Sequence, residues 1–326
     1  MSILDAIAAE RGPLFIVGSS KNSGKTTFLN YLNKELATRL AHPVGLLTIG
    51  RDGEPEDAVW HHTKPPVALL PGNLFVTVEA ELVRLAMDAE LVEALPFATM
   101  LGPLVIGRAG NKVKAEIIGP DTNRQLWQIV ARLEEHRCGH QLIDGAFERR
   151  TQVASHDGAR LILVVSPDIA GTPEGAGRWL ARQSDLFGLP KPPGGFPAPP
   201  DVAPLGLYWW RGDQWTTEPA KGAPVYCKGP LTDSLVDRHL KDLRDREILI
   251  EDPTKFFLDD LRWKRLQRRL RGFYVQRQLR LLMAAVNPFG LMRRFKAPAF
   301  FDAIAKACPD LPLMDVVAGL ENKKKA

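Results

Sequence analysis

The fold is decided by the stretch from Leu14 to Leu40, which reads LFIVGSSKNSGKTTFLNYLNKELATRL. Its first four residues are apolar and include Ile16 and Val17, whose β-branched side chains favour a strand. Its last thirteen residues place apolar side chains at helical spacing, namely Phe28, Leu29, Leu32, Leu36 and Leu40. The glycines and serines between these segments suit neither element. The stretch therefore predicts a strand, a tight loop and a helix.

The loop, GSSKNSGKTT over residues 18–27, has the chemistry of a phosphate site. Its backbone N–H groups and the helix N-terminus can surround a polyphosphate, while the Lys25 ammonium reaches the β and γ oxygens and the Thr26 hydroxyl ligates Mg²⁺. One departure is that Ser19 stands where a P-loop normally has glycine, and Gly18 lies one position earlier. The sequence predicts a P-loop for ATP and Mg²⁺ formed by Ser20, Lys21, Asn22, Ser23, Gly24, Lys25, Thr26 and Thr27.

A P-loop NTPase also needs a carboxylate at the end of a neighbouring strand to hold the metal through water. Asp144 follows the apolar run at 140–143, and Asp52 follows the run at 44–49. Either aspartate can instead belong to an ordinary Asp-Gly turn. We expect Asp144 or Asp52 to act with Lys25 in catalysis and with Thr26 in binding the metal.

Recognition of the base has one candidate. The apolar run at 281–286 ends at Asn287, where a side-chain amide can face a purine. No Lys-x-Asp follows Asn287, which favours adenine over guanine. A turn formed by Asn287 and Pro288 is the alternative.

Strand-like runs alternate with helical patterns along much of the chain. Strands are expected at 44–49, 74–78, 104–106, 113–118, 140–143 and 161–165, and helices at 81–95 and 123–133. This alternation predicts an α/β fold, a doubly wound and mostly parallel P-loop NTPase sheet. Residues 108–112 are expected to form the turn of an inserted hairpin.

The composition of the sequence changes after residue 180. Residues 1–180 are expected to form the nucleotide-binding half. Residues 181–222 are expected to form a Pro/Gly-rich connection, with seven prolines from Pro190 to Pro204. This connection includes a tryptophan-containing hairpin at 207–216. In residues 223–320 strand-like and helical patterns alternate again, and this segment is expected to complete the sheet of the nucleotide-binding half. Residues 321–326 form a basic tail.

Composition and charge narrow the class of protein. With 45% hydrophobic and 25% charged residues the chain is globular, which excludes disorder for most of its length. The net charge of +5 is local, because eight basic and no acidic residues lie from Arg262 to Arg280 and the remainder carries −3. We expect a basic helix there, either a solvated face or a surface for an anionic partner.

The cysteines and the apolar runs bear on location. Three cysteines favour a reducing compartment, and the N-terminal residues lack the pattern of a secretory signal. The longest wholly apolar stretches, 161–165 and 281–286, are far shorter than a membrane span. We therefore expect a cytoplasmic protein with no membrane segment.

Six motifs together resemble one family. They are SKNSGKTT at 20–27, DGE at 52–54 with Lys64-Pro65 downstream, DGA at 144–146, GPLTD at 229–233, EDPTK at 251–255 and VNPF at 286–289. In this order they resemble the P-loop subunit of the reactivase for adenosylcobalamin-dependent lysine 5,6-aminomutase and its D-ornithine 4,5-aminomutase relative. The resemblance covers residues 13–167 and 223–317. Ser23 stands where that family leads us to expect alanine, and 180–222 has no counterpart.

The resemblance implies an ATP-driven chaperone. Such a subunit acts with a MutS-like partner subunit to exchange damaged cobalamin on the aminomutase. Asp252 and Lys255 of the EDPTK motif have no role that the family assigns, and a turn capped by Thr254 accounts for the same residues.

Two other functions fit parts of the sequence. A dethiobiotin synthetase-like ligase would use ATP on a small acid, with the loop at 52–54 lining its pocket. A nucleic-acid-linked ATPase would use the basic segment from Arg262 to Arg280.

Overall fold

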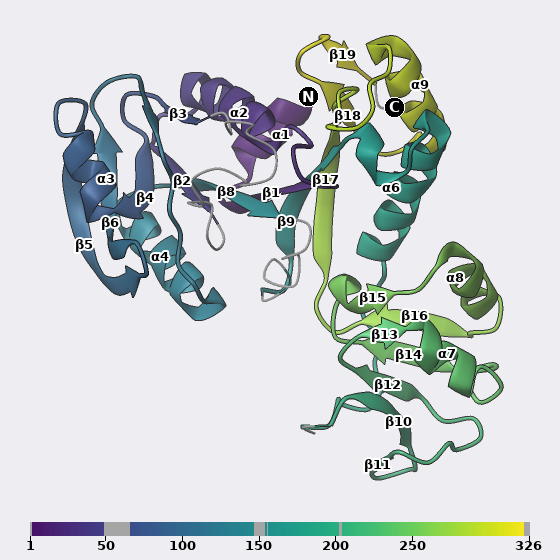
Figure 1. Cartoon of the computed structure of the whole chain (residues 1–326). Coiled ribbons are helices and arrows are strands. Elements are labelled where there is room, and N and C mark those ends of the chain that lie inside the picture. The colour runs from purple at the N-terminus through teal and green to yellow at the C-terminus, as the bar shows by residue number, and fades with distance from the viewer. Residues whose placement is uncertain (1, 49–65, 147–153, 155, 202–203, 323–326) are drawn as a thin grey trace. The chain divides into compact units, whose positions relative to one another are not determined.

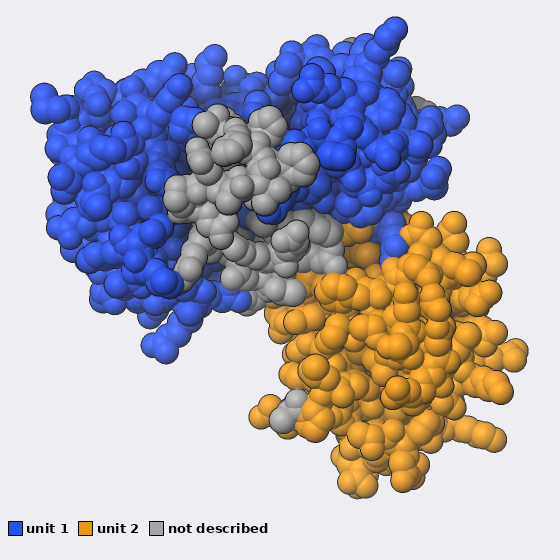
Figure 2. Space-filling model, in the orientation of Figure 1, with its two compact units in different colours: residues 1–153, 160–182, 281–326 blue, residues 154–159, 183–280 orange. Residues whose placement is uncertain are grey.

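The computed structural model describes residues 2–48, 66–146, 154, 156–201 and 204–322. The chain divides into two compact units, which Figure 2 colours separately. Unit 1 consists of residues 1–153, 160–182 and 281–326, and unit 2 of residues 154–159 and 183–280. Each unit has a hydrophobic core of its own.

Unit 1 is built on a large sheet. Its strands are β1 (Gly12–Gly18), β2 (Val44–Thr48), β4 (Leu74–Val78), β5 (Ala89–Thr99), β6 (Gly102–Ala109), β8 (His140–Ala146), β9 (Ala159–Val165), β17 (Leu279–Val286), β18 (Leu313–Asp315) and β19 (Leu320–Glu321). Within the described residues the order is β19-β18-β17-β9-β1-β8-β2-β4-β6-β5. Strands β9, β1, β8, β2 and β4 pair in parallel, as do β17 and β18. The expected α/β architecture with a mostly parallel sheet is confirmed.

Helices cover both sides of the central strands (Figure 1). Those of unit 1 are α1 (Ile3–Ala9), α2 (Lys25–Arg39), α3 (Glu79–Arg84), α4 (Asn123–Glu135), α6 (Pro173–Phe187) and α9 (Ala297–Ala307). Leu14 and Ile16 of β1 share a core with Leu32 of α2. Phe15 points the other way and meets Trp127 of α4 edge-on, with ring centroids 6.0 Å apart. Because β1 is covered on both faces, its residues are apolar without alternation.

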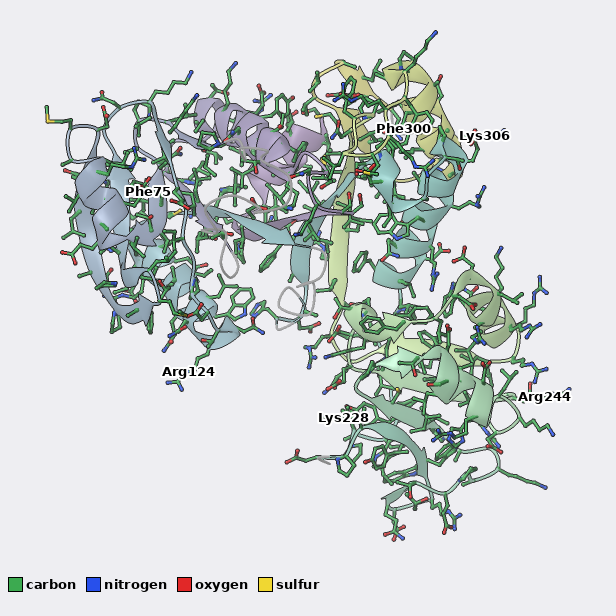
Figure 3. The ribbon with its side chains drawn as sticks, viewed as in Figure 1. Phe75, Arg124, Lys228, Arg244, Phe300 and Lys306 are labelled. Atoms are coloured by element: carbon green, nitrogen blue, oxygen red, sulfur yellow. The ribbon has the colours of Figure 1, made fainter. Side chains whose placement is uncertain are left out.

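The labelled side chains of Figure 3 show how unit 1 separates apolar from charged residues. Phe75 and Phe300 are completely buried. Arg124 of α4 and Lys306 of α9 project from the surface. Within the described ranges, no helix combines the length and the hydropathy that crossing a membrane requires.

Unit 2 has a smaller sheet. Its strands are β10 (Gly206–Trp210), β11 (Trp215–Thr216), β12 (Val225–Lys228), β14 (Glu247–Ile250) and β16 (Gly272–Val275), in the order β11-β10-β12-β14-β16. Strands β12, β14 and β16 are parallel, connected through α7 (Asp233–His239) and α8 (Asp260–Gln267). The short strands β13 (Leu231–Thr232) and β15 (Phe256–Phe257) form a separate parallel pair. The expected tryptophan hairpin is confirmed as β10 and β11.

Two local expectations were wrong. The helix expected at 81–95 is only the six-residue α3, after which residues 89–99 form β5 and pair with β6. The turn at 108–112 does not close a hairpin, because β7 (Val113–Ala115) pairs with β3 (Val67–Leu69) instead of β6. The hairpin of this region is β5–β6.

The expected division at residue 223 was also wrong in part. Residues 225–275 do not complete the first sheet but form, with β10 and β11, the sheet of unit 2. Only the segment from β17 onward returns to the first sheet.

Candidate functional site

The loop at 18–27 lies between β1 and α2 as expected. Its backbone turns through Asn22, with φ 57°, and Gly24, with φ 97°. Gly24 is the residue that precedes α2, and its carbonyl accepts the first helical hydrogen bond, from the N–H of Phe28. The amides before Phe28 at the start of α2 therefore have no acceptor within the helix. They are placed to donate to an anion.

Gly18 is the residue that the loop requires to be glycine. A Cβ at this position would lie 2.2 Å from Ser23 Oγ and 2.8 Å from Lys25 Cγ. Ser23 is completely buried and has little room to move. The side chains of Ser23 and Lys25 thus pack closely against Gly18.

Ser19 explains the departure from the usual P-loop pattern. Its side chain is buried, and its Oγ accepts a hydrogen bond from the N–H of Ser166 at 3.1 Å. Its own N–H donates to the carbonyl of Val164 at 2.8 Å. Ser19 thus holds the loop to the end of β9 by hydrogen bonds. Gly18 is the residue against which other groups of the loop pack closely.

Ser166 was not predicted from the sequence. It is completely buried directly after β9, and its hydroxyl lies 2.9 Å from that of Ser20. Its only sequence signal is its place after the apolar run at 161–165. That signal acquires meaning once β9 is known to neighbour β1.

Asn287 holds the loop from another strand end. Its Nδ2 donates to the carbonyls of Ser23 and Phe289 at 2.8 and 2.7 Å, and its Oδ1 accepts from the N–H of Phe289 at 3.1 Å. A Cβ on Gly24 would come within 2.9 Å of the same Nδ2. The sequence left open whether this amide faces a purine or belongs to a turn with Pro288, and in the structure its Nδ2 donates to two backbone carbonyls.

Asp144 lies on β8 next to β1, in register with Ile16, and its residue is only 8% exposed. On its other side it pairs with Thr48 of β2, whose Oγ1 donates to the Asp144 carbonyl at 3.3 Å. Thr26 and Asp144 line one cavity of about 440 Å³. The fold therefore brings together two of the predicted metal-binding residues. Asp52, the other candidate, lies outside the described residues.

These groups fit a magnesium nucleotide. Hydroxyl and carboxylate oxygens, here from Thr26 and Asp144, are the ligands that Mg²⁺ prefers. Lys25 is partly exposed at the start of α2, where its ammonium can reach an anion on the amides of the loop. Ser23 Oγ is buried with no hydrogen-bond partner among the described residues, which leaves a polar atom for a ligand.

The two carboxylates of the EDPTK motif, residues 251–255, accept hydrogen bonds from other groups of unit 2. The Asp252 carboxylate is buried and accepts hydrogen bonds from the N–H and the hydroxyl of Thr254 and from Arg277 Nη2, the last at 2.9 Å. Glu251 accepts from the N–H of Gly229 at 3.0 Å. The motif fastens the ends of β12, β14 and β16 together, so Asp252 has a structural part.

The basic segment differs from the helix that we expected. Helix α8 ends at Gln267, and the remaining basic residues lie between α8 and β16, between β16 and β17, and in β17. Arg262 is held by Asp237 and by Asp259, with a 2.6 Å ion pair to Asp237. Arg271 pairs with Glu247 and Arg277 with Asp252. Three of the eight positive charges are thus paired with carboxylates inside unit 2.

One aromatic side chain of this segment bears on nucleic-acid binding. Trp263 is buried in the core of unit 2 and cannot stack on a base at the surface.

Comparison of the chain with family models, with curated proteins and with solved structures gave no match in any of the three.

Proposed function

We propose that this protein is a P-loop ATPase that binds ATP and Mg²⁺ at the loop of residues 18–27. The observation that carries the proposal is that Thr26, at the start of α2, and Asp144, at the end of a neighbouring strand, line one cavity. A nucleotide-dependent enzyme needs this pair at the edge of the sheet where the parallel strands end. Bound Mg²⁺ would neutralise charge on the β and γ phosphates.

The residues of the chain have separate parts in this proposal. The amides of the loop and of the first turn of α2 hold the phosphates, and Lys25 neutralises their charge. Ser166 and Asn287 keep the loop in shape through their bonds to its serines. Thr26 and Asp144 supply the oxygen atoms for the metal.

We test this first with Lys25→Ala and its matched control Lys34→Ala, which removes an exposed lysine from the same helix. Loss of the phosphate cation should weaken ATP binding at least tenfold, about 1.4 kcal/mol, and abolish hydrolysis. Lys34→Ala should change neither. Titration calorimetry with Mg-ATP and phosphate release give the two readouts. An affinity of Lys25→Ala within about threefold of the wild type would contradict the site.

Asp144→Asn tests the metal. If Asp144 holds Mg²⁺, turnover should fall roughly 100-fold or more while ATP affinity falls much less, because the metal acts on charge that develops in the transition state. Steady-state rates at saturating ATP check this. Full turnover in Asp144→Asn with a large loss in Asp52→Asn would transfer the part to Asp52.

We further propose, on the family resemblance, that the ATPase serves a cytoplasmic reactivase. ATP can help to release damaged cobalamin from an aminomutase only if two nucleotide states hold the target differently. A connection between the loop and an exposed segment supports this proposal. Asn287 joins Ser23 to the segment at 288–294, which exposes Phe289, Leu291 and Met292.

Reactivation tests the finer proposal. The protein, its MutS-like partner subunit, ATP, Mg²⁺ and fresh adenosylcobalamin should restore an inactivated aminomutase, and Lys25→Ala should not. The protein alone should hydrolyse ATP slowly. Equal reactivation by the variant, or without ATP, would overturn the chaperone and leave the ATPase standing.

The cavity itself favours a second candidate, an ATP-dependent ligase that acts on a small acid. Besides Thr26 and Asp144 it is lined by apolar side chains such as Leu29 and Leu46 and by charged ones such as Lys114, as a substrate pocket would be. Formation of ADP that depends strictly on an added acid would favour this candidate, whereas turnover with ATP alone favours the first.

A further inference from the structure

The cavity beside the loop has the size and lining of a small-molecule site. Its volume of about 440 Å³ lies within the usual range for ligand pockets. Its lining residues come from α2, β2, β3, α3, β7 and β8, and are Thr26, Leu29, Leu46, Leu47, Thr48, Pro66, Val67, Arg84, Lys114, Ala115, Glu116, Ile117 and Asp144. All of them belong to unit 1.

About half of the cavity wall is apolar, and this part is firmly held. Leu29, Leu46, Ala115 and Ile117 are 0–6% exposed and belong to the core of unit 1. Core residues pack closely and move little, so the cavity is preformed. It can accept an apolar chain without rearrangement of the fold.

Charged residues complete the lining. Arg84 is fixed by Glu81, through Nε to Oε2 at 2.6 Å and Nη2 to Oε1 at 2.5 Å. Glu81 Oε1 also accepts the N–H of Glu116 at 2.8 Å, which ties α3 to the strand that carries Lys114. The charge of Arg84 is therefore largely matched by its own carboxylate partner.

Lys114 is the cation that remains for a ligand. It is exposed, and among the described residues no carboxylate pairs with it. Glu116, two residues along, lies near enough to Arg84 to interact with its charge. A single available ammonium beside apolar walls suits a ligand with one carboxylate at that end.

We infer that the cavity binds a small organic acid, with its carboxylate on Lys114 and a short apolar chain along Leu29, Leu46 and Ile117. This goes beyond the proposed chaperone, which needs only a nucleotide and protein partners. The binding depends on the cavity and not on ATP. If the nucleotide site is as proposed, the other end of the acid lies beside Thr26 and Asp144.

The test uses the full-length protein and a series of probes, the α,ω-dicarboxylates from succinate to suberate and the monocarboxylates of the same lengths. Calorimetric titration without nucleotide should give at least one acid with a Kd below about 1 mM and an optimum chain length. Lys114→Gln should weaken that acid about tenfold or more. Lys112→Gln, which removes an exposed lysine that does not line the cavity, is the matched control and should bind as the wild type does.

Ala115→Val gives a second readout, because added methyl groups narrow the cavity without altering charge. It should weaken the longer acids most, and circular dichroism shows whether the variant is folded. The inference is overturned if no acid of the series binds to the wild type, or if Lys114→Gln and Lys112→Gln weaken binding equally. Absence of ATP hydrolysis in the wild type would overturn the proposed function and leave this binding intact.

Discussion

In the proposed nucleotide site, Gly18 and Ser19 together take the place of the glycine that an ordinary P-loop has six residues before its lysine. Gly18→Ala should lower ATP affinity at least tenfold, because the new Cβ would meet Ser23 Oγ at 2.2 Å and distort the loop. Ser19→Gly should leave ATP affinity within about threefold of the wild type, because the phosphates are held by backbone amides. Titration with Mg-ATP measures both.

The two substitutions should also separate in stability. Ser19→Gly loses the hydrogen bond from the N–H of Ser166 and should lower the free energy of unfolding by about 1 kcal/mol. Urea unfolding checks this. If Ser19→Gly impaired ATP binding as much as Gly18→Ala, the assignment of the close approach to Gly18 would fail.

His140 makes the stability of unit 1 depend on pH. Burial lowers the pKa of His140 below its usual 6.5, and the ring stacks on His42 with centroids 5.1 Å apart. Below about pH 6.5 the unfolded chain takes up a proton that the folded chain does not, so the free energy of unfolding falls as the pH falls toward the lowered pKa. Above 6.5 this contribution is fully present.

His140→Phe, which keeps a ring without a titrating group, should lose less stability than the wild type between pH 7 and 5.5. Urea unfolding at several pH values measures the slope. His136→Gln, which removes a partly exposed histidine that pairs with Glu93 at 2.8 Å, should retain the loss that His140 causes. Identical slopes for His140→Phe and the wild type would rule out this titration.

At the residue scale, the sequence predicts site residues from local patterns: Lys25 and Thr26 from the loop, and Asp144 from the apolar run before it. The structure places Thr26 and Asp144 on one cavity, and their parts in binding a nucleotide stay predictions. Ser166 and the bonds of Asn287 to the loop could not be predicted, because they depend on which strands flank β1. That order is fixed by packing across the sheet, not by the residues of the loop.

At the scale of elements, Asn287 connects the end of β17 with the loop before α2. Asn287→Asp removes the two N–H donors and places a carboxylate against the carbonyls of Ser23 and Phe289. Losing such bonds costs about 1–2 kcal/mol, so affinity should fall roughly 5- to 30-fold, by the same factor for ATP and GTP. Competition between the two nucleotides measures this. A change in their ratio would instead give Asn287 a part in reading the base.

The wrong helix at 81–95 shows what an element-scale pattern leaves out. Leu82 and Leu85 are buried, as a helical pattern requires, but the residues that follow alternate in exposure along β5. Strand β5 exists because β6 offers it a partner, and its register shifts twice between Leu91 and Ala98. A partner that is close in space overrides a weak local preference.

At the scale of the whole molecule, the chain forms two separate cores, although strand-like and helical patterns alternate along most of its sequence. The parallel strands of unit 2 are rich in apolar residues like those of unit 1, so periodicity predicted their type but not the sheet that they join. Tertiary packing decides this: Leu231, Val236 and Phe256 gather around Trp263 and Ile250 in a separate core. The prolines after residue 189 predicted a connection near the boundary of the two units. They did not predict that a second sheet follows.

Separate cores should respond separately to a broken contact. Asp252 is 1% exposed and its side chain pairs with Arg277, so Asp252→Asn would leave that arginine without its carboxylate. Because the arginine is partly exposed, losing the carboxylate of such a pair costs about 2 kcal/mol. Amide hydrogen exchange should therefore rise in β12, β14 and β16 and stay unchanged in β1 and β8. ATP affinity should also stay unchanged, since the loop lies in unit 1.

Glu218→Gln is the matched control for this prediction. It removes one partner of an exposed ion pair in unit 2, with Arg211 at 3.1 Å, and exposed pairs contribute under about 1 kcal/mol. Exchange in both units should then resemble the wild type. If Asp252→Asn raised exchange in β1 and β8 as much as in β14, the two cores would unfold as one cooperative body, and a nucleotide bound at the loop would stabilise both.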